Sequence, residues 1–312
     1  MAAHSKKVVI AALLGNGAIA TIKFIVAAIT RSSAMLAEAV HSLADTGNQA
    51  LLLLGIKRST KPADELHPFG YGQEQYFWSF VVANMLFFIG AVVSIYEGVR
   101  KLGHPHPIER AWLIYIILGV SFVIEGTALT IAYREFNRHR PSGMGLLRAM
   151  RRTKDTSVLV VLLEDSAALS GLLVAFFGVL AAELTGMMIF DAIASIAIGL
   201  ILGAVALVLA WETKDLLIGE AATREDRAAI RAAVEAFDEV QAVGQLLTMH
   251  LAPSKILVAM DLEFSDGLGA NAIEAVVDRI EAAIREKVPA VDRIFIEAEE
   301  VRVLARRTAP RS

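Results

Sequence analysis

One apolar stretch of the sequence, residues 34–56, contains a row of polar side chains. They follow one another at intervals of three, four and three residues: Glu38, His41, Asp45 and Asn48. This spacing places them on one face of a helix, where each ionisable group costs roughly 2.5–3.5 kcal/mol if the helix lies in a membrane. An imidazole and a carboxylate one turn apart can bind one small cation together, and zinc accepts that ligand set. The alternative is a polar seam that joins helices by hydrogen bonds.

A second apolar stretch, residues 157–184, contains the adjacent acids Glu164 and Asp165. Neighbouring helix positions point about 100° apart, so only one of these two acids can face the row of His41 and Asp45 directly. Two helices that present acids at mid-depth repel each other unless a cation lies between them. We therefore expect an intramembrane metal site between the two stretches, and either acid can be its ligand.

Two polar segments outside the apolar stretches contain further possible ligands. Those in the loop of residues 57–75 are Asp64, Glu65 and His67, among prolines and glycines that break a helix. Those near the C-terminus are Asp261, Glu297 and Glu299, on predicted strands. Such groups can bind a metal, but acids in these positions are more often simply solvated.

The elements that must position these side chains follow from the composition. Of the 312 residues, 55% are hydrophobic, and they occur in long blocks separated by charged segments. Six blocks are long enough to span a bilayer as helices: residues 8–30, 34–56, 76–99, 111–133, 157–184 and 189–211. We predict an α-helical membrane protein with six transmembrane helices.

Basic residues are distributed unequally over the segments between the blocks. If the N-terminus is cytoplasmic, the outer loops contain only Arg31, Arg100, Lys101 and Arg110, and the inner segments contain many more. The positive-inside rule then predicts that both termini are cytoplasmic, with the bacterial inner membrane as the expected location. The net charge of −3 gives no indication of a nucleic-acid partner.

The tail that follows the last block is charged and predicts a separate domain. Its expected elements are a helix at 224–237, strands at 245–251 and 256–264, a helix at 271–287 and a strand at 292–299. This α-β-β-α-β order is typical of a small α+β domain with helices on one face of the sheet. We therefore divide the chain into a transmembrane domain, 1–213, and a cytoplasmic dimerisation and regulatory domain, 214–312.

Several motifs of other protein classes are missing from the sequence. It contains no Cys, which excludes disulfides, thiolate ligands and cysteine nucleophiles. It also contains no G-x-x-x-x-G-K-[ST], H-E-x-x-H or G-x-S-x-G motif. We expect no enzyme activity and no cofactor, so that any transport must run on ion gradients.

Four segments, read together with the tail, resemble a known family. They are SSAMLAEAVHSLADTGNQ (32–49), STKPADELHPFGYGQEQYFWSF (59–80), VLLEDSAALSGLL (161–173) and LLIGEAA (216–222). Their order is similar to that of the cation diffusion facilitator family of zinc transporters, and in particular to the subgroup of the mitochondrial zinc transporter and its bacterial relatives. The resemblance implies a homodimer with a metallochaperone-like cytoplasmic domain, which exchanges a divalent metal, usually zinc, for protons across the lipid bilayer.

The same resemblance implies a set of metal ligands. The transport site of the family falls on His41, Asp45 and Asp165, and its fourth position falls on Val161, which cannot bind a metal. Glu164 is the candidate for the fourth ligand, with Glu38 or a water as the alternative. The loop site of the family falls on Asp64 and His67, and its cytoplasmic-domain ligands fall on Asp261, Glu297 and Glu299.

We predict from these observations a metal–proton antiporter in which His41 carries protons, because imidazole exchanges protons near neutral pH. Two other classes stay open. One is a membrane-anchored, metal-responsive interaction protein without net transport. The other is an intramembrane enzyme that uses Glu164, Asp165 and His41 as acid–base groups.

Overall fold

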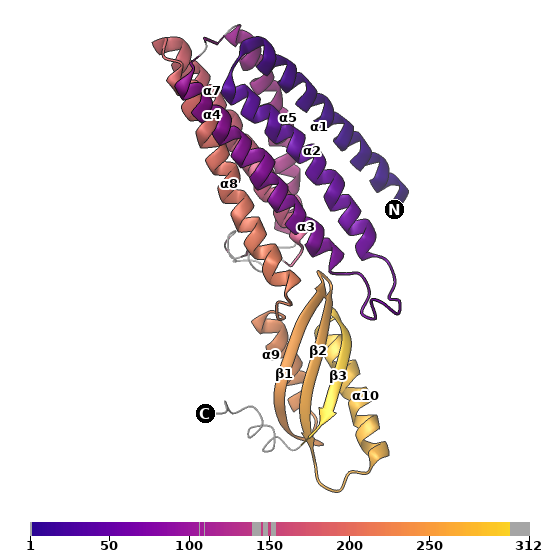
Figure 1. Ribbon diagram of the computed structural model, residues 1–312. Coiled ribbons are helices and arrows are strands. Elements are labelled where there is room, and N and C mark those ends of the chain that lie inside the picture. Colours follow the sequence, from indigo (N-terminus) through magenta and orange to yellow (C-terminus); the bar gives the residue numbers. More distant parts are fainter. Residues whose placement is uncertain are drawn as a thin grey trace, which may run out of the picture. The chain divides into compact units, whose positions relative to one another are not determined.

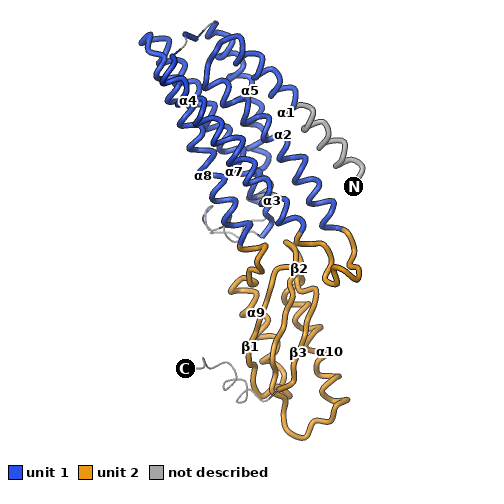
Figure 2. The backbone as a smooth tube through the Cα atoms, viewed as in Figure 1, with its two compact units in different colours: residues 1–60, 74–214 blue, residues 61–73, 215–312 orange. Residues whose placement is uncertain are grey.

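The computed structural model describes residues 2–105, 107–108, 110–138, 145, 149–150 and 154–299, without the side chains of 2–15, 135, 138, 157 and 158. The chain divides into two compact units, shown in Figure 2. The first comprises Met1–Thr60 and Glu74–Lys214, and the second Lys61–Gln73 and Asp215–Ser312. The loop that follows the second predicted block therefore belongs to the same unit as the C-terminal domain.

The first unit is a bundle of long helices that lie side by side (Figure 1). Its elements are α1 (Ala2–Thr30), α2 (Ser33–Ser59), α3 (Glu74–Met85), the π-helical segment η1 (Leu86–Val92), α4 (Val93–Gly103), α5 (Ala111–Arg138), α7 (Thr156–Thr185) and α8 (Ile189–Leu217). The segments α3, η1 and α4 follow one another without a break and form one helix, Glu74–Gly103. Apolar side chains between the helices form the core of this unit, and many of them are alanines.

Four helices among the described residues are long and apolar enough to cross a membrane: Glu74–Gly103, Ala111–Arg134, Leu159–Thr185 and Ile189–Leu217. The segment Asn16–Thr30 of α1 is apolar but shorter, and α2 contains the ionisable row of Glu38, His41 and Asp45. The structure thus has a multi-pass helical membrane domain. The count of six spans stays a prediction.

Glycines allow α8 to approach the neighbouring segments η1 and α4 closely. A Cβ atom added at Gly199 would lie 2.8 Å from the carbonyl oxygen of Ala91, and one at Gly98 would lie 2.7 Å from that of Ala192. Close backbone approach at small residues is a common way to pack helices where lipid removes the hydrophobic driving force.

The second unit has the predicted α-β-β-α-β order. Its elements are α9 (Arg224–Glu235), β1 (Val240–Ala252), β2 (Lys255–Phe264), α10 (Ala270–Lys287) and β3 (Val291–Ala298). The strands lie in the order β1-β2-β3, with β1 antiparallel and β3 parallel to β2. Every second residue of β2, from Ile256 to Leu262, is buried and packs with Ile230 of α9 and Ile280 of α10.

Strand β1 begins at Val240, earlier than the predicted start at Gln245. The pairing of β1 with β2 shifts register between Val243 and Leu246. A bulge at this point accommodates Gly244, which in the sequence looks like the end of a strand. The helix and strand types in this unit are otherwise as predicted.

Candidate metal centre

Helix α2 positions the polar row. The side chain of Ser32 caps this helix by accepting a hydrogen bond from the backbone N–H of Met35 at 3.1 Å. From this start, the helical repeat turns Glu38, His41 and Asn48 toward the interior, where all three are fully buried. The row therefore lies on the face of α2 that packs within the bundle, as its spacing predicts.

A cavity of about 420 Å³ opens beside this row, between α1, α2, α5 and α7. Four carboxylates line it: Asp45, Glu125, Glu164 and Asp165. Other polar groups in its wall come from Ser42, Gln49 and Asn16, and Val161 is part of its apolar wall. The carboxylates of Glu164, Glu125 and Asp165 lie close enough to repel a negative charge on Asp45.

Both adjacent acids of α7 line this one cavity, whereas the helical repeat predicts that only one can face the row directly. Glu164 is buried, whereas Asp165 is partly exposed. The side-chain amide of Asn48 donates a hydrogen bond to Glu164 Oε1. Asn48 thus joins α2 to α7 by a hydrogen bond, as expected for a polar seam. The other residues of the row, Glu38, His41 and Asp45, do not make such a bond to α7 among the described residues.

His41 lies next to Asp45 on the following turn of α2. Its Nδ1 is 3.3 Å from Asp45 Oδ1, and the imidazole is buried. Within the described residues, neither ring nitrogen has a partner that meets the geometry of a hydrogen bond. The described lining of the cavity includes Asp45 but not His41. An imidazole without committed hydrogen bonds keeps its nitrogen lone pair available to a cation.

The predicted alternative ligand Glu38 is engaged elsewhere. The ammonium group of Lys23, fully buried on α1, lies 3.3 Å from Glu38 Oε2 and 3.0 Å from Glu125 Oε1, and it donates to Ser42 Oγ at 2.7 Å. Neither Lys23 nor Glu125 is among the residues that the sequence predicts for this site. The available signal was their charge, because opposite charges in two apolar blocks need partners.

The four carboxylates line the cavity from separate positions, and the imidazole of His41 lies beside it. Across the described part of the chain, no group of three His, Asp or Glu side chains is arranged to hold one ion together. Three of these side chains can bind one ion together only if they move toward it.

The predicted loop ligands Asp64 and His67 do lie together. The carboxylate of Asp64 accepts hydrogen bonds from Tyr71 Oη at 2.7 Å, from the backbone N–H of His67 at 2.9 Å and from Lys61 Nζ at 3.1 Å. These bonds, that from Tyr71 first, hold the pKa of Asp64 well below its usual range. The imidazole of His67 packs against the ring of Tyr71, with centroids 4.2 Å apart.

Two of the predicted acids of the C-terminal domain, Asp261 and Glu297, lie on the sheet face opposite to the helices. Asp261 and Glu297 are paired across β2 and β3, and Asp261 Oδ2 accepts a hydrogen bond from the backbone N–H of Gln245 at 3.3 Å. Glu299 follows the end of β3, and its backbone N–H donates to the carbonyl of Leu262 at 3.1 Å. The sheet thus brings the acids near one another, with Glu297 exposed.

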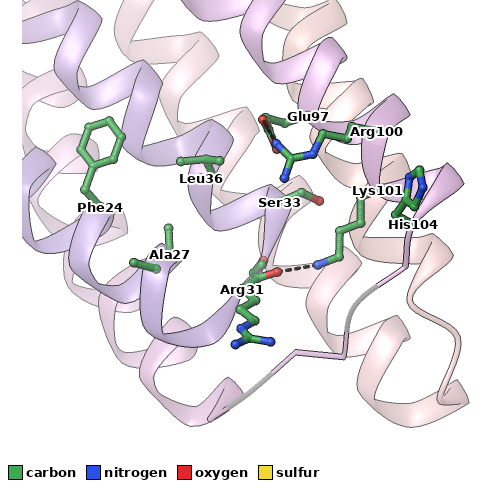
Figure 3. A pocket seen from close by; sticks show the side chains of 11 residues that line it. Phe24, Ala27, Arg31, Ser33, Leu36, Glu97, Arg100, Lys101 and His104 are labelled. Atoms are coloured by element: carbon green, nitrogen blue, oxygen red, sulfur yellow. Dashed lines mark hydrogen bonds and ion pairs between the residues drawn. The ribbon is translucent and has the colours of Figure 1, made fainter.

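A second cavity, of about 480 Å³, lies by the turn between α1 and α2 (Figure 3). Lys101 of α4 donates to the carbonyl of Arg31 in its wall at 2.7 Å and also to Asp191 of α8 at 2.7 Å. Asp191 in turn accepts from Ser32 Oγ and from the backbone N–H of Ser33. These buried charges are mutually satisfied and join the ends of three helices.

Comparisons with known proteins match most of the chain to domains of cation efflux proteins. Residues 9–218 match the family described as the cation efflux transmembrane domain, and residues 222–301 match the cation efflux protein cytoplasmic domain. The human proton-coupled zinc antiporter SLC30A9, mitochondrial, is 34% identical over 259 residues, which are 83% of this chain and 46% of that protein. Metal tolerance protein C4 of Arabidopsis thaliana is 36% identical over 224 residues, 72% of this chain and 49% of that protein.

A bacterial relative extends the likeness over 92% of the chain. The cation-efflux pump FieF of Klebsiella pneumoniae is 26% identical over 291 residues, 92% of this chain and 90% of the pump. The chain spans about half the length of the mitochondrial and plant relatives. These families comprise transporters and not enzymes. On both domain matches, the chain belongs to the cation efflux family, whose members are the cation diffusion facilitators.

Proposed function

We propose that this protein exports a divalent metal cation, with zinc as its substrate and protons as the counter-ion. The observation that carries the proposal is the cavity within the membrane bundle, which Asp45, Glu164 and Asp165 line beside the buried His41. A dication offsets the mutual repulsion of these carboxylates, which apolar surroundings cannot do. Relatives named as a proton-coupled zinc antiporter and a cation-efflux pump support the same substrate class.

The donor set favours exchange of the metal for protons. Zinc binds neutral imidazole and ionised carboxylate, so its binding displaces protons that these groups carry. In the proposed cycle the metal enters from the cytoplasmic side, and protons from the other side compete it off. His41 is the proposed proton carrier, with Asp45 and Asp165 as the carboxylate ligands.

The proposed architecture is a homodimer with six spanning helices in each protomer and both termini in the cytoplasm of a bacterial cell. The transmembrane domain is 1–213, and the dimerisation and regulatory domain is 214–312. The match of residues 222–301 to the cytoplasmic domain of cation efflux proteins supports this division. Asp261, Glu297 and Glu299 stay proposed ligands there, as do Asp64 and His67 in the loop, where Lys61 is bonded to one carboxylate oxygen of Asp64.

Zinc uptake into proteoliposomes under an imposed pH gradient tests the proposal. His41→Ala and Asp165→Ala should abolish exchange in protein that remains folded, while Glu183→Gln, an acid of α7 that accepts a hydrogen bond from Tyr115 outside the described cavity lining, should exchange like the wild type. Unchanged exchange in both cavity variants contradicts the assignment. A wild type that binds zinc and moves none is the result expected of a membrane-anchored interaction protein.

A further inference from the structure

The two carboxylate oxygens of Glu125 have different surroundings. Oε1 lies 3.0 Å from the ammonium group of Lys23. Oε2 is buried and has no hydrogen-bond partner within the described structure, while the residue itself lines the cavity. A buried carboxylate oxygen without a partner is costly, and structures normally provide one.

Lys23 holds Glu125 by one oxygen only. An ammonium group has three donors, and here all three have acceptors, on Glu38, Ser42 and Glu125. Lys23 therefore has no further donor for the second oxygen of Glu125. Within the described lining of the cavity there is no Lys or Arg that could supply one.

The cavity places Glu125 among the proposed ligands. Its negative charge acts on both Asp45 and Asp165, and α5 packs along α7, so that Glu125 and the apolar Val161 are parts of the same wall. Of the remaining acids, Glu164 already accepts from Asn48, and Glu38 is bound to Lys23 outside the lining. Within the described residues, Glu125 of α5 therefore has a free carboxylate oxygen in the same wall as Val161, the position without a ligand group.

We propose that Glu125 is a further metal ligand of this cavity, which presents its unpartnered oxygen to the ion while Lys23 holds the other oxygen. This inference rests on the proposed function, because it concerns the same cavity. The competing explanation is that Glu125 serves only as a counter-ion of Lys23. The two explanations make different predictions for an uncharged side chain of the same shape.

Glu125→Gln separates them. The amide oxygen of Gln can still accept from Lys23, and Lys23 keeps the charge of Glu38 beside it, so the packing of the bundle is retained. The amide is a poor zinc ligand compared with a carboxylate. As a counter-ion only, Glu125 is replaceable by Gln without effect on metal binding; as a ligand, it is not.

The test is titration of the full-length purified protein in nanodiscs with zinc chloride, followed calorimetrically, with thermal unfolding to verify the fold. Glu125→Gln should weaken zinc binding tenfold or more, and the control Glu183→Gln should bind like the wild type. Glu125→Asp, which keeps the carboxylate, should bind more tightly than Glu125→Gln. Cobalt(II), used as a spectroscopic probe, should show a changed visible absorption spectrum in Glu125→Gln.

Zinc affinity and cobalt spectrum that are both unchanged in folded Glu125→Gln overturn the inference. Equal weakening in Glu183→Gln overturns it too, since the loss is then not specific to the cavity. In either case the proposed function stands if wild-type protein exchanges zinc for protons and His41→Ala does not. If the wild type itself neither binds nor moves zinc, the proposed function fails first.

Discussion

Replacement of Lys23 by methionine should destabilise the membrane bundle strongly. Lys23 is fully buried, and its ammonium group is bonded to Glu38, Ser42 and Glu125. The variant leaves the fully buried Glu38 without its cation, and Glu38 Oε1 has no partner among the described residues even in the wild type. Breaking a buried pair from one side costs about 3–5 kcal/mol, which is roughly a hundredfold to a few thousandfold in the unfolding equilibrium constant.

A second substitution should restore most of this stability. In Lys23→Met/Glu38→Gln the uncompensated charge is gone, and replacement of a whole buried pair is often close to neutral. Gln is the appropriate partner because Glu38 Oε1 lies against Gly171 of α7, where a bulkier side chain does not fit. The double variant should therefore be more stable than Lys23→Met by about 2 kcal/mol or more.

Denaturant unfolding of the purified protein in mild detergent, followed by helical circular dichroism, measures both effects. Lys57→Met is the matched control, because Lys57 is exposed near the end of α2 and should change stability by less than about 0.5 kcal/mol. If Lys23→Met is as stable as Lys57→Met, the buried charges do not depend on one another and the reasoning is wrong. The same conclusion follows if the stability changes of Lys23→Met and Glu38→Gln, each measured alone, add up to that of the double variant.

Two further predictions concern other parts of the chain. In the loop, the hydrogen bonds from Tyr71 and Lys61 depress the pKa of Asp64. Their contribution to loop stability is therefore complete above the pKa of the unfolded chain, about 3.9, and it is lost as pH falls through the lower pKa of the folded state. Tyr71→Phe should raise the Asp64 pKa toward 3.9 in an NMR titration of the carboxyl carbon, and an unmoved titration curve is the contrary result. At the turn between α1 and α2, Asp191→Asn should leave Lys101 buried without its counter-ion and lower the unfolding midpoint by the amount expected for about 3–5 kcal/mol. A midpoint equal to that of the wild type excludes this role.

The features that local periodicity determines are predictable from the sequence. Intervals of three and four residues place Glu38, His41 and Asp45 on one helix face without knowledge of any neighbour. The alternation of β2 from Ile256 to Leu262 gives its buried face in the same way. For these elements the pattern and the packing depend on the same repeat, of 3.6 or 2 residues.

The partners across helices are not predictable from these patterns. Lys23 and Glu125 are 102 positions apart in the sequence, and no periodicity selects Glu125 over the other buried acids. Both Glu164 and Asp165 line one cavity, which the 100° between neighbouring helix positions does not predict. These choices depend on the three-dimensional packing of α1, α2, α5 and α7.

The most direct test of the account measures zinc and proton fluxes at the same time in proteoliposomes that contain the wild-type protein. A pH-sensitive dye and a zinc-sensitive dye inside the vesicles report the two ions under an imposed pH gradient. Metal–proton antiport predicts opposite movement of zinc and protons, with both directions reversed when the gradient is reversed. Zinc movement that is indifferent to the sign of the gradient, or no zinc movement by folded protein, contradicts it.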